Sequence, residues 1–159
     1  MNGRVEQGRW VIILSFIIAM ILIFLPLPES LRFLRPNWVL LVLIYWMMAL
    51  PKRVGLGTAW FLGLLMDVMM GGILGVTAFV YALIAFLVLR FHLQLRQFPL
   101  WQQGLWIFLL IFFGQLVLVL KSMGNVGWYN WWLPAVTSTL LWPLVFAVLR
   151  WSRRTFRVS

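Results

Sequence analysis

Ionisable side chains are scarce in this sequence, and their spacing limits the chemistry available to the protein. The chain holds three acidic residues, one histidine and no cysteine. Glycosidase-like or aspartic-protease-like catalysis needs two carboxylates in one site, but Glu6, Glu29 and Asp67 are widely separated. His92 has no second histidine and no cysteine with which to bind a metal ion. No glycine motif for binding phosphate or a dinucleotide occurs. We therefore expect a protein that is not an enzyme and carries no metal ion or cofactor.

Asp67 is the acidic residue with the most unusual surroundings. Its window, residues 63–72, is otherwise apolar and rich in glycine. An aspartate at the centre of a transmembrane helix costs about 2.5–3.5 kcal/mol on insertion scales, so it needs a partner, a cavity or a place near the interface. One interpretation is that Asp67 contacts a partner helix or a bound ligand. The other is that it lies at the outer end of a helix and caps the turn at Gly71 and Gly72.

Several glycines near Asp67 also have two interpretations. Gly71 and Gly75 have the spacing that places two small residues on one helix face, where another helix can approach closely. The adjacent pair Gly71 and Gly72 equally suits a turn that precedes a helix. Gly55, Gly57 and Gly63 suggest that the third predicted helix packs closely along its length.

A short motif, Arg35, Pro36, Asn37 and Trp38, precedes an apolar run. Proline suits the first turn of a helix, because its missing N–H group has no partner there. The motif therefore predicts either a helix start with an interfacial tryptophan or part of a partner site. Gln115 lies in the middle of another apolar run, and a hydrogen bond to a neighbouring helix is the expected role for such a residue.

Composition assigns the chain to the membrane proteins. Its residues are 64% hydrophobic and 10% charged, whereas soluble domains average about 45–50% apolar and about 25% charged residues. This composition excludes a soluble enzyme and also intrinsic disorder. The net charge of +10 would suggest a nucleic-acid partner in a soluble protein. In a membrane protein it is explained by lysine and arginine in cytoplasmic loops.

Six apolar runs predict an all-α integral membrane protein with six transmembrane helices, in a single polytopic domain over residues 1–159. The runs are residues 10–27, 38–50, 54–66, 73–89, 105–120 and 131–149. The first makes a helix of about 27 Å, near the thickness of a hydrocarbon core, and no cleavage site typical of a signal peptide follows it. The second and third are short, so they form full, kinked or re-entrant spans. We expect residues 90–97 to extend the fourth helix along the interface, with a break at Pro99.

The basic residues indicate the orientation of these spans. With six spans and a cytoplasmic N-terminus, three basic residues lie outside: Arg32, Arg35 and Lys121. The ten on the cytoplasmic side are Arg4, Arg9, Lys52, Arg53, Arg90, Arg96, Arg150, Arg153, Arg154 and Arg157. Fusing the third and fourth runs into one span would reverse this excess. The positive-inside rule therefore favours six spans with both termini in the cytoplasm.

Several residue strings are more distinctive than the apolar runs. Between residues 35 and 75 they are RPNWVLL at 35–41, YW at 45–46, LPKRVG at 50–55, the Gly63 and Asp67 pair, and LG at 74–75. GRWVI at 8–12, WQQ at 101–103 and LWP at 141–143 extend the pattern toward both ends. Together these strings resemble the MreD family of bacterial rod shape-determining proteins over essentially the whole chain.

This resemblance implies a non-enzymatic scaffold of the cell-wall elongation machinery in the inner membrane. MreD-like proteins pair with the bitopic protein MreC, whose transmembrane helix we expect this chain to bind. Together they connect MreB filaments to the polymerase RodA and its class B penicillin-binding partner. The implied fold resembles the six-helix substrate-binding subunits of energy-coupling-factor transporters. The candidate partner-binding or helix-packing residues are Asp67, Gly63, Gly71, Gly75, Arg35, Pro36, Asn37 and Trp38.

A solute- or lipid-binding membrane transport subunit is the alternative function. A transporter-like fold often keeps a cavity, and Asp67, Tyr81 and Gln115 could line one. A polar ligand usually needs more convergent polar side chains than these spans offer, whereas an amphiphile is easier to accommodate. Loss of rod shape on deletion favours the scaffold, and an uptake defect with normal shape favours transport.

Overall fold

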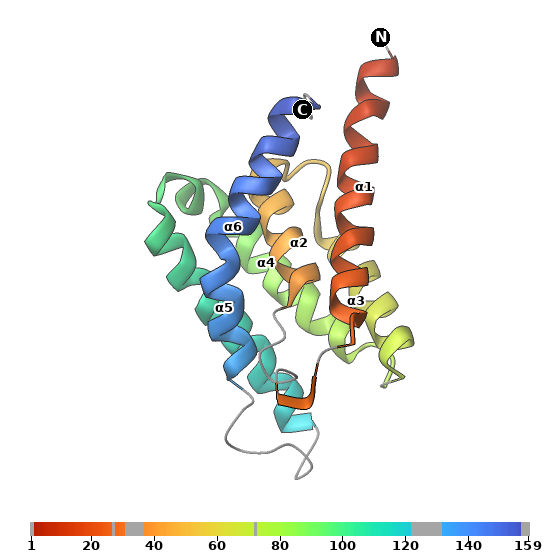
Figure 1. Ribbon diagram of the computed structural model, residues 1–159, viewed down its shortest axis with the longest axis vertical. Helices are drawn as coiled ribbons and strands as arrows, with labels where there is room; N and C mark the ends of the chain where they lie inside the picture. Colours follow the sequence, from red (N-terminus) through yellow and green to blue (C-terminus); the bar gives the residue numbers. More distant parts are fainter. Residues whose placement is uncertain (1, 27, 31–36, 72, 122–131, 157–159) are drawn as a thin grey trace.

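The computed structural model describes residues 2–26, 28–30, 37–71, 73–121 and 132–156, and this part of the chain folds into six α-helices and no strand (Figure 1). The helices are α1 (Asn2–Phe24), α2 (Trp38–Ala49), α3 (Leu56–Met70), α4 (Val76–Gln97), α5 (Leu100–Lys121) and α6 (Leu133–Thr155). Each helix overlaps one predicted apolar run. The extension of the fourth helix through residues 90–97 is confirmed, because α4 ends at Gln97, two residues before Pro99.

Three helices are long and apolar enough to cross a membrane. They are Val76–Gln97, Leu100–Leu120 and Leu133–Thr155, whereas the described apolar stretches of α1, α2 and α3 are shorter. Large apolar side chains are exposed along the outer helices, for example Phe79, Leu109 and Leu140. Soluble monomers rarely expose apolar surface on this scale. The architecture is therefore that of an all-helical membrane protein.

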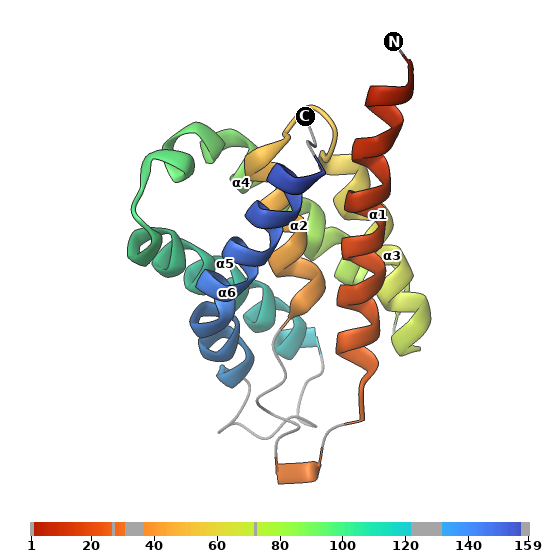
Figure 2. The same ribbon diagram turned by 45° about the horizontal axis from the view of Figure 1, so that its top comes forward.

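The helix α2 is the centre of the bundle. Every residue from Val39 to Met48 is buried, and α2 packs against α1, α4 and α6 (Figures 1 and 2). A helix that is apolar on all sides is stable only when it is covered on all sides. The short second run, which contains no charged residue, thus becomes the core of the fold.

The helices define two ends of the bundle. At one end α1 begins, α6 ends and both chain termini lie (Figure 1); we call it the basic end. The basic residues at this end are Lys52 and Arg53 after α2, Arg96 in the last turn of α4, Arg153 and Arg154 in the last turn of α6, and Arg150 one turn earlier in α6. At the opposite end, α3 finishes and α4 begins around Asp67, and we call it the Asp67 end.

Candidate functional site

Asp67 lies in the last turn of α3 and is buried, with 3% of its surface exposed. Its carboxylate accepts hydrogen bonds from three backbone N–H groups: Gly75 to Oδ2 at 3.0 Å, Thr77 to Oδ1 at 3.2 Å and Ala78 to Oδ2 at 3.4 Å. These groups lie at the beginning of α4, where N–H groups lack partners within the helix. A carboxylate also suits the positive end of the helix dipole. Asp67 therefore caps α4 from the neighbouring helix.

This geometry corresponds to the architectural interpretation of Asp67, with one difference. The sequence placed the cap at the Gly71 and Gly72 turn, but the hydrogen bonds go to the first residues of α4. A contact between Asp67 and a partner helix stays a prediction. Among the described residues, all the hydrogen bonds of the carboxylate are internal to the chain.

Gly63 brings α3 and α4 together one turn before Asp67. A Cβ atom at Gly63 would lie 2.7 Å from the backbone nitrogen of Ala78 and closer still to its Cα. Side-chain atoms do not approach a backbone so closely, so only glycine fits this crossing. The expected close packing is therefore seen at Gly63, where the partner is α4 of the same chain. It is not seen at Gly55 or Gly57, because an added Cβ atom would meet nothing within 4 Å at either position.

Gly71 and Gly75 do not share a helix face, so that interpretation of their spacing is wrong. Gly71 ends α3 and Gly75 precedes α4. Both have left-handed backbones, with φ of 69° and 100°, and a Cβ atom at either position would meet nothing within 4 Å. Their glycine character serves the conformation of the turn, which L-residues adopt at a cost. A role for either in binding a partner stays a prediction.

Asn37 connects three helices at the same end of the bundle. It is the N-cap of α2, where its Oδ1 accepts a hydrogen bond from the N–H of Leu40 at 3.3 Å. Tyr81 of α4 donates its hydroxyl to the same oxygen at 3.2 Å, and the N–H of Asn37 donates to Ser138 Oγ of α6 at 3.0 Å. The predicted helix start is thus confirmed. Arg35 and Pro36 lie outside the described residues.

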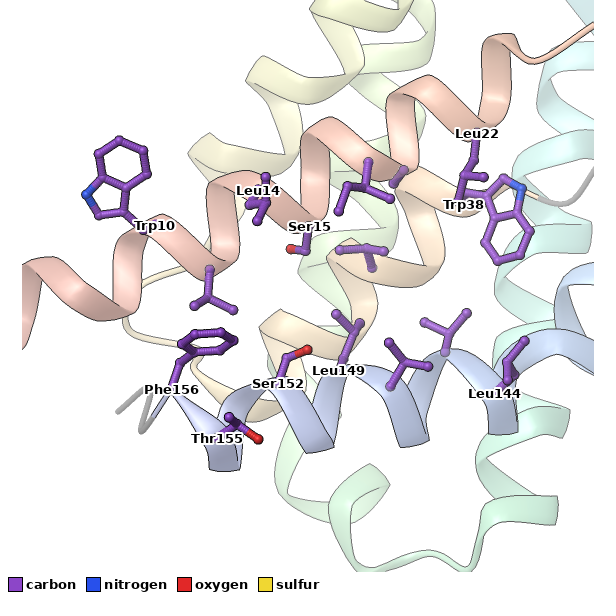
Figure 3. Close-up of a pocket in the computed structure, with 16 residues that line it drawn as sticks. Trp10, Leu14, Ser15, Leu22, Trp38, Leu144, Leu149, Ser152, Thr155 and Phe156 are labelled. Carbon is purple, nitrogen blue, oxygen red and sulfur yellow. The ribbon is translucent and has the colours of Figure 1, made fainter.

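A groove runs between α1 and α6, with α2 as its floor (Figure 3). Its volume is about 860 Å³. Trp10 and Phe156 lie at one end, and Trp38 and Leu144 lie at the other. The lining is almost wholly apolar, and most of its few polar side-chain atoms are hydroxyls. Of the predicted partner-binding residues that the structure describes, Trp38 lines this groove and the others do not.

The hydroxyls of the groove are the side chains of Ser15, Ser152 and Thr155. Ser15 is already satisfied, because its Oγ accepts from the indole N–H of Trp46 at 2.9 Å and donates to the carbonyl of Ile12 at 2.6 Å. The groove wall therefore presents mainly hydrocarbon. Such a surface suits an apolar helix or acyl chains and gives little recognition of a polar solute.

The residues predicted to line a transport cavity, Asp67, Tyr81 and Gln115, do not line this groove. Asp67 and Tyr81 are buried and hydrogen-bonded, and Gln115 is half-buried on α5. No group of three metal-ligating side chains comes together within the described ranges. His92 is engaged locally, since its Nδ1 lies 2.6 Å from the carbonyl oxygen of Leu89.

Sequence reasoning missed a second buried network, which lies near the basic end. Gln103 of α5 is 4% exposed. Its Nε2 donates to the carbonyl of Leu95 on α4 at 2.8 Å, and its Oε1 accepts from the indole N–H of Trp142 on α6 at 3.4 Å. In the sequence, the strings that contain Gln103 and Trp142 contribute only to the family resemblance. A buried glutamine in the first turn of a span is the signal that could have indicated a link between helices.

Comparison with known proteins decides the family. The family described as rod shape-determining protein MreD matches residues 5–152. The chain belongs to the MreD family. It is 36% identical over 154 residues to the rod shape-determining protein MreD of Haemophilus influenzae, an alignment that covers 94% of this chain and 95% of that protein. No solved structure is significantly similar to the chain.

Membership of the MreD family gives the chain a role in bacterial cell shape. The family match spans nearly all of the six helices, including the Asn37 and Asp67 networks and most of the groove. The family's role and the geometry of these features together form the basis for a functional proposal.

Proposed function

We propose that the chain is a non-enzymatic scaffold of the cell-wall elongation complex in the bacterial inner membrane. In this proposal it binds the transmembrane helix of MreC and, with MreC, couples MreB filaments to RodA and a class B penicillin-binding protein. The observation that carries the proposal is the apolar groove between α1 and α6 (Figure 3).

The groove suits one apolar helix. Its lining residues on α1 run from Trp10 to Leu22, which corresponds to about 18 Å along a helix axis. The side chains of Ser15, Ala19 and Ser152 in the groove lining are small, so they leave room for a helix to approach. Helix association in membranes depends on close van der Waals packing, and small residues at an interface allow it. A transmembrane helix seated here would contact α1, α2 and α6 together.

The topology in this proposal has six membrane-crossing helices in one domain, with both termini in the cytoplasm and an arrangement like the substrate-binding subunits of energy-coupling-factor transporters. The basic end then faces the cytoplasm, in agreement with the positive-inside rule. The Asp67 end faces the periplasm. Trp38 lies at the outer end of the groove. We propose that the motif Arg35, Pro36, Asn37 and Trp38 contacts MreC.

The α3–α4 pair has an indirect role in this proposal. Asp67, Gly63, Gly71 and Gly75 set the crossing of α3 and α4 and the turn between them. Because α4 packs against α2, and α2 forms the floor of the groove, these residues support the binding surface from behind. Loss of this support would weaken MreC binding without removing a direct contact.

The experiment that tests the proposal fills the groove. Leu14→Trp and Val148→Trp add bulk to opposite walls. Ile13→Trp and Leu140→Trp place the same side chain at exposed positions on the same two helices, outside the groove lining. The groove variants are expected to lose co-purification of MreC and to leave cells round, and the control variants are expected to retain both. Equal recovery of MreC with all four variants would refute the groove as its binding site.

A lipid- or solute-binding transport subunit is the second candidate, and the apolar lining favours a lipid over a polar solute. The two functions differ in phenotype. A variant with a filled groove that keeps rod shape but loses a retained lipid in native mass spectrometry would support lipid binding instead of the scaffold.

A further inference from the structure

A second, smaller pocket lies at the basic end and is unlike the groove. Its volume is about 220 Å³, and it is formed where α2, α4, α5 and α6 meet. Three arginines line it: Arg96 from α4, and Arg150 and Arg153 from α6. Tyr45 of α2 and Gln103 of α5 supply its other polar side chains. Four helices therefore converge on a concave site that carries three positive charges.

Among the described residues that line this pocket, none is acidic. The acidic side chains described there are Glu29, in the connection between α1 and α2, and Asp67. The carboxylate of Asp67 is bound to the N-terminus of α4 at the opposite end of the bundle. Neither acid lines the pocket. Three guanidinium groups in one small pocket repel one another, and an external anion would relieve that repulsion.

The charge on helix ends explains part of this arrangement but not all of it. Arg96 and Arg153 lie in the last turns of their helices, where a cation interacts favourably with the helix dipole. Arg150 lies one turn earlier, three residues before Arg153, so both side chains share a helix face. Arg154 is also in the last turn of α6 and does not line the pocket. The pocket thus selects particular arginines from the basic end.

The chemistry of the lining fits a phosphate group. Guanidinium groups present paired N–H donors that match two oxygens of a phosphate. Each phosphate oxygen can accept from a different arginine when the donors converge from several helices. Tyr45 is buried and also lines the pocket, and its hydroxyl can donate a further hydrogen bond. A carboxylate offers two oxygens in one plane and would satisfy fewer of these donors.

The position of the pocket in the membrane favours a lipid as the source of the phosphate. Three exposed tryptophans mark the basic end: Trp10 on α1, Trp101 on α5 and Trp151 on α6, with 75%, 70% and 65% of their surfaces exposed. Exposed tryptophans gather at the depth of lipid headgroups. Basic pockets between transmembrane helices at this depth bind the headgroups of anionic lipids.

We infer that the pocket lined by Arg96, Arg150 and Arg153 binds the phosphate of an anionic phospholipid headgroup. This site is separate from the groove, because none of these arginines lines the groove. An anionic lipid held here ties the ends of α2, α4 and α6 to one another and fixes the depth of the basic end in the bilayer.

The test compares lipid retention by the full chain. The protein is transferred to vesicles of phosphatidylcholine with or without phosphatidylglycerol, extracted, and examined by native mass spectrometry. The wild type is expected to retain phosphatidylglycerol in preference to phosphatidylcholine. Arg150→Gln and Arg153→Gln are each expected to reduce that retention about tenfold, as expected for one lost charge-assisted hydrogen bond. Arg150→Lys keeps the charge but not the paired donors and should fall between.

The matched control is Arg154→Gln, which removes the same charge from the neighbouring position outside the pocket. It is expected to retain phosphatidylglycerol like the wild type. An equal loss in Arg154→Gln and Arg153→Gln would overturn the site, because the preference would then come from diffuse charge. Equal retention of both lipids by the wild type would also overturn it.

Two further measurements test whether the variants fold normally and whether the ligand is a lipid or free phosphate. Thermal unfolding in phosphatidylcholine alone is expected to be the same for the wild type and the pocket variants, whereas added phosphatidylglycerol should raise the Tm of the wild type only. In the second measurement, inorganic phosphate is added in the absence of phosphatidylglycerol. If inorganic phosphate stabilises the wild type and phosphatidylglycerol does not, the ligand is free phosphate and the assignment to a lipid is wrong.

Discussion

At the Asp67 end of the bundle, polar side chains bind one another and the helix termini, whereas at the basic end three arginines surround a pocket that no described acid enters. The side-chain oxygens of Asp67 and Asn37 together accept hydrogen bonds from four backbone N–H groups and one hydroxyl. Arg96, Arg150 and Arg153 face the small pocket without a carboxylate. The first end is organised around interactions within the chain, and the second is organised to receive something from outside it.

This difference follows from what each end gains by burial. A buried carboxylate in an apolar bundle is stable only when hydrogen bonds replace its lost hydration, and the start of α4 supplies three. The arginines lie at the rim, where water and lipid headgroups can solvate them. Replacing the polar residues at the Asp67 end should therefore lower the free energy of unfolding. Replacing the arginines at the basic end should chiefly alter ligand binding.

The largest effect at the Asp67 end is expected from Gly63→Val. Its side chain would overlap the backbone of α4 at Ala78, so α3 and α4 must separate, at a cost of about 3 kcal/mol or more. Thermal unfolding in detergent measures the loss, and cells that depend on the variant should become round. Gly57→Ala on the same helix is the control, because nothing lies within 4 Å of its added Cβ. If Gly57→Ala lowers the stability by a comparable amount, the close contact between Gly63 and α4 is not the cause of the loss.

The second effect is the loss of the cap on α4. Asp67→Ala leaves three N–H groups at Gly75, Thr77 and Ala78 without their acceptor. Unsatisfied buried groups cost about 1–3 kcal/mol each, but water at the turn can rescue some, so we expect a total loss of about 2–3 kcal/mol. Thermal unfolding of the purified protein measures it.

Asp67→Asn distinguishes capping from charge recognition. The amide keeps one acceptor oxygen and should retain part of the stability, because it can still accept from α4. If Asp67 also contacts a charged group of MreC, Asp67→Asn should abolish co-purification while stability is largely kept. If co-purification of MreC falls in proportion to stability in both Asp67→Ala and Asp67→Asn, the role of Asp67 is structural and it makes no direct contact with MreC.

The positions of the helices could be predicted from the sequence, because hydropathy is a local property. Each of the six apolar runs overlaps a helix. Residues 90–97, in which polar and apolar side chains alternate, belong to the fourth helix, as predicted. The central place of α2 was implicit in a run with no charged residue, but apolarity alone does not distinguish a helix covered by protein from one covered by lipid.

The partners of the polar residues could not be predicted, because they come from distant parts of the chain. Asn37 and Ser138 are separated by 101 positions and Gln103 and Trp142 by 39. Which helices are neighbours determines these pairs, and hydropathy carries no information about that. The donors to Asp67 are close to it in sequence. They could not be identified in advance, because the length of the turn after α3 determines which N–H groups reach the carboxylate. The groove likewise depends on the separation of α1 from α6.

A smaller effect is expected at the junction of α2, α4 and α6. Tyr81→Phe removes the hydroxyl that donates to Asn37 Oδ1 and should lower stability by about 0.5–1 kcal/mol, the range for hydrogen bonds between helices in membranes. Because the N–H of Leu40 also donates to that oxygen, the acceptor is not left unsatisfied. A double-mutant cycle with Asn37→Ala should show a coupling of the same size, and strict additivity would contradict a direct bond.

The smallest effect on stability is expected at the basic end. In detergent or phosphatidylcholine, Arg150→Gln should leave the free energy of unfolding within about 0.5 kcal/mol of the wild type, because it removes no carboxylate partner and relieves repulsion from Arg96 and Arg153. Its contact with the ring of Phe146, 5.9 Å from the ring centroid, is exposed and contributes little. Thermal unfolding of Arg150→Gln beside Asp67→Asn measures the contrast directly. If Arg150→Gln destabilises the lipid-free protein as strongly as Asp67→Asn does, the arginines support the fold and the two ends are alike. If the two proteins differ in stability only when phosphatidylglycerol is present, the basic end depends on its ligand, as a pocket lined by three arginines requires.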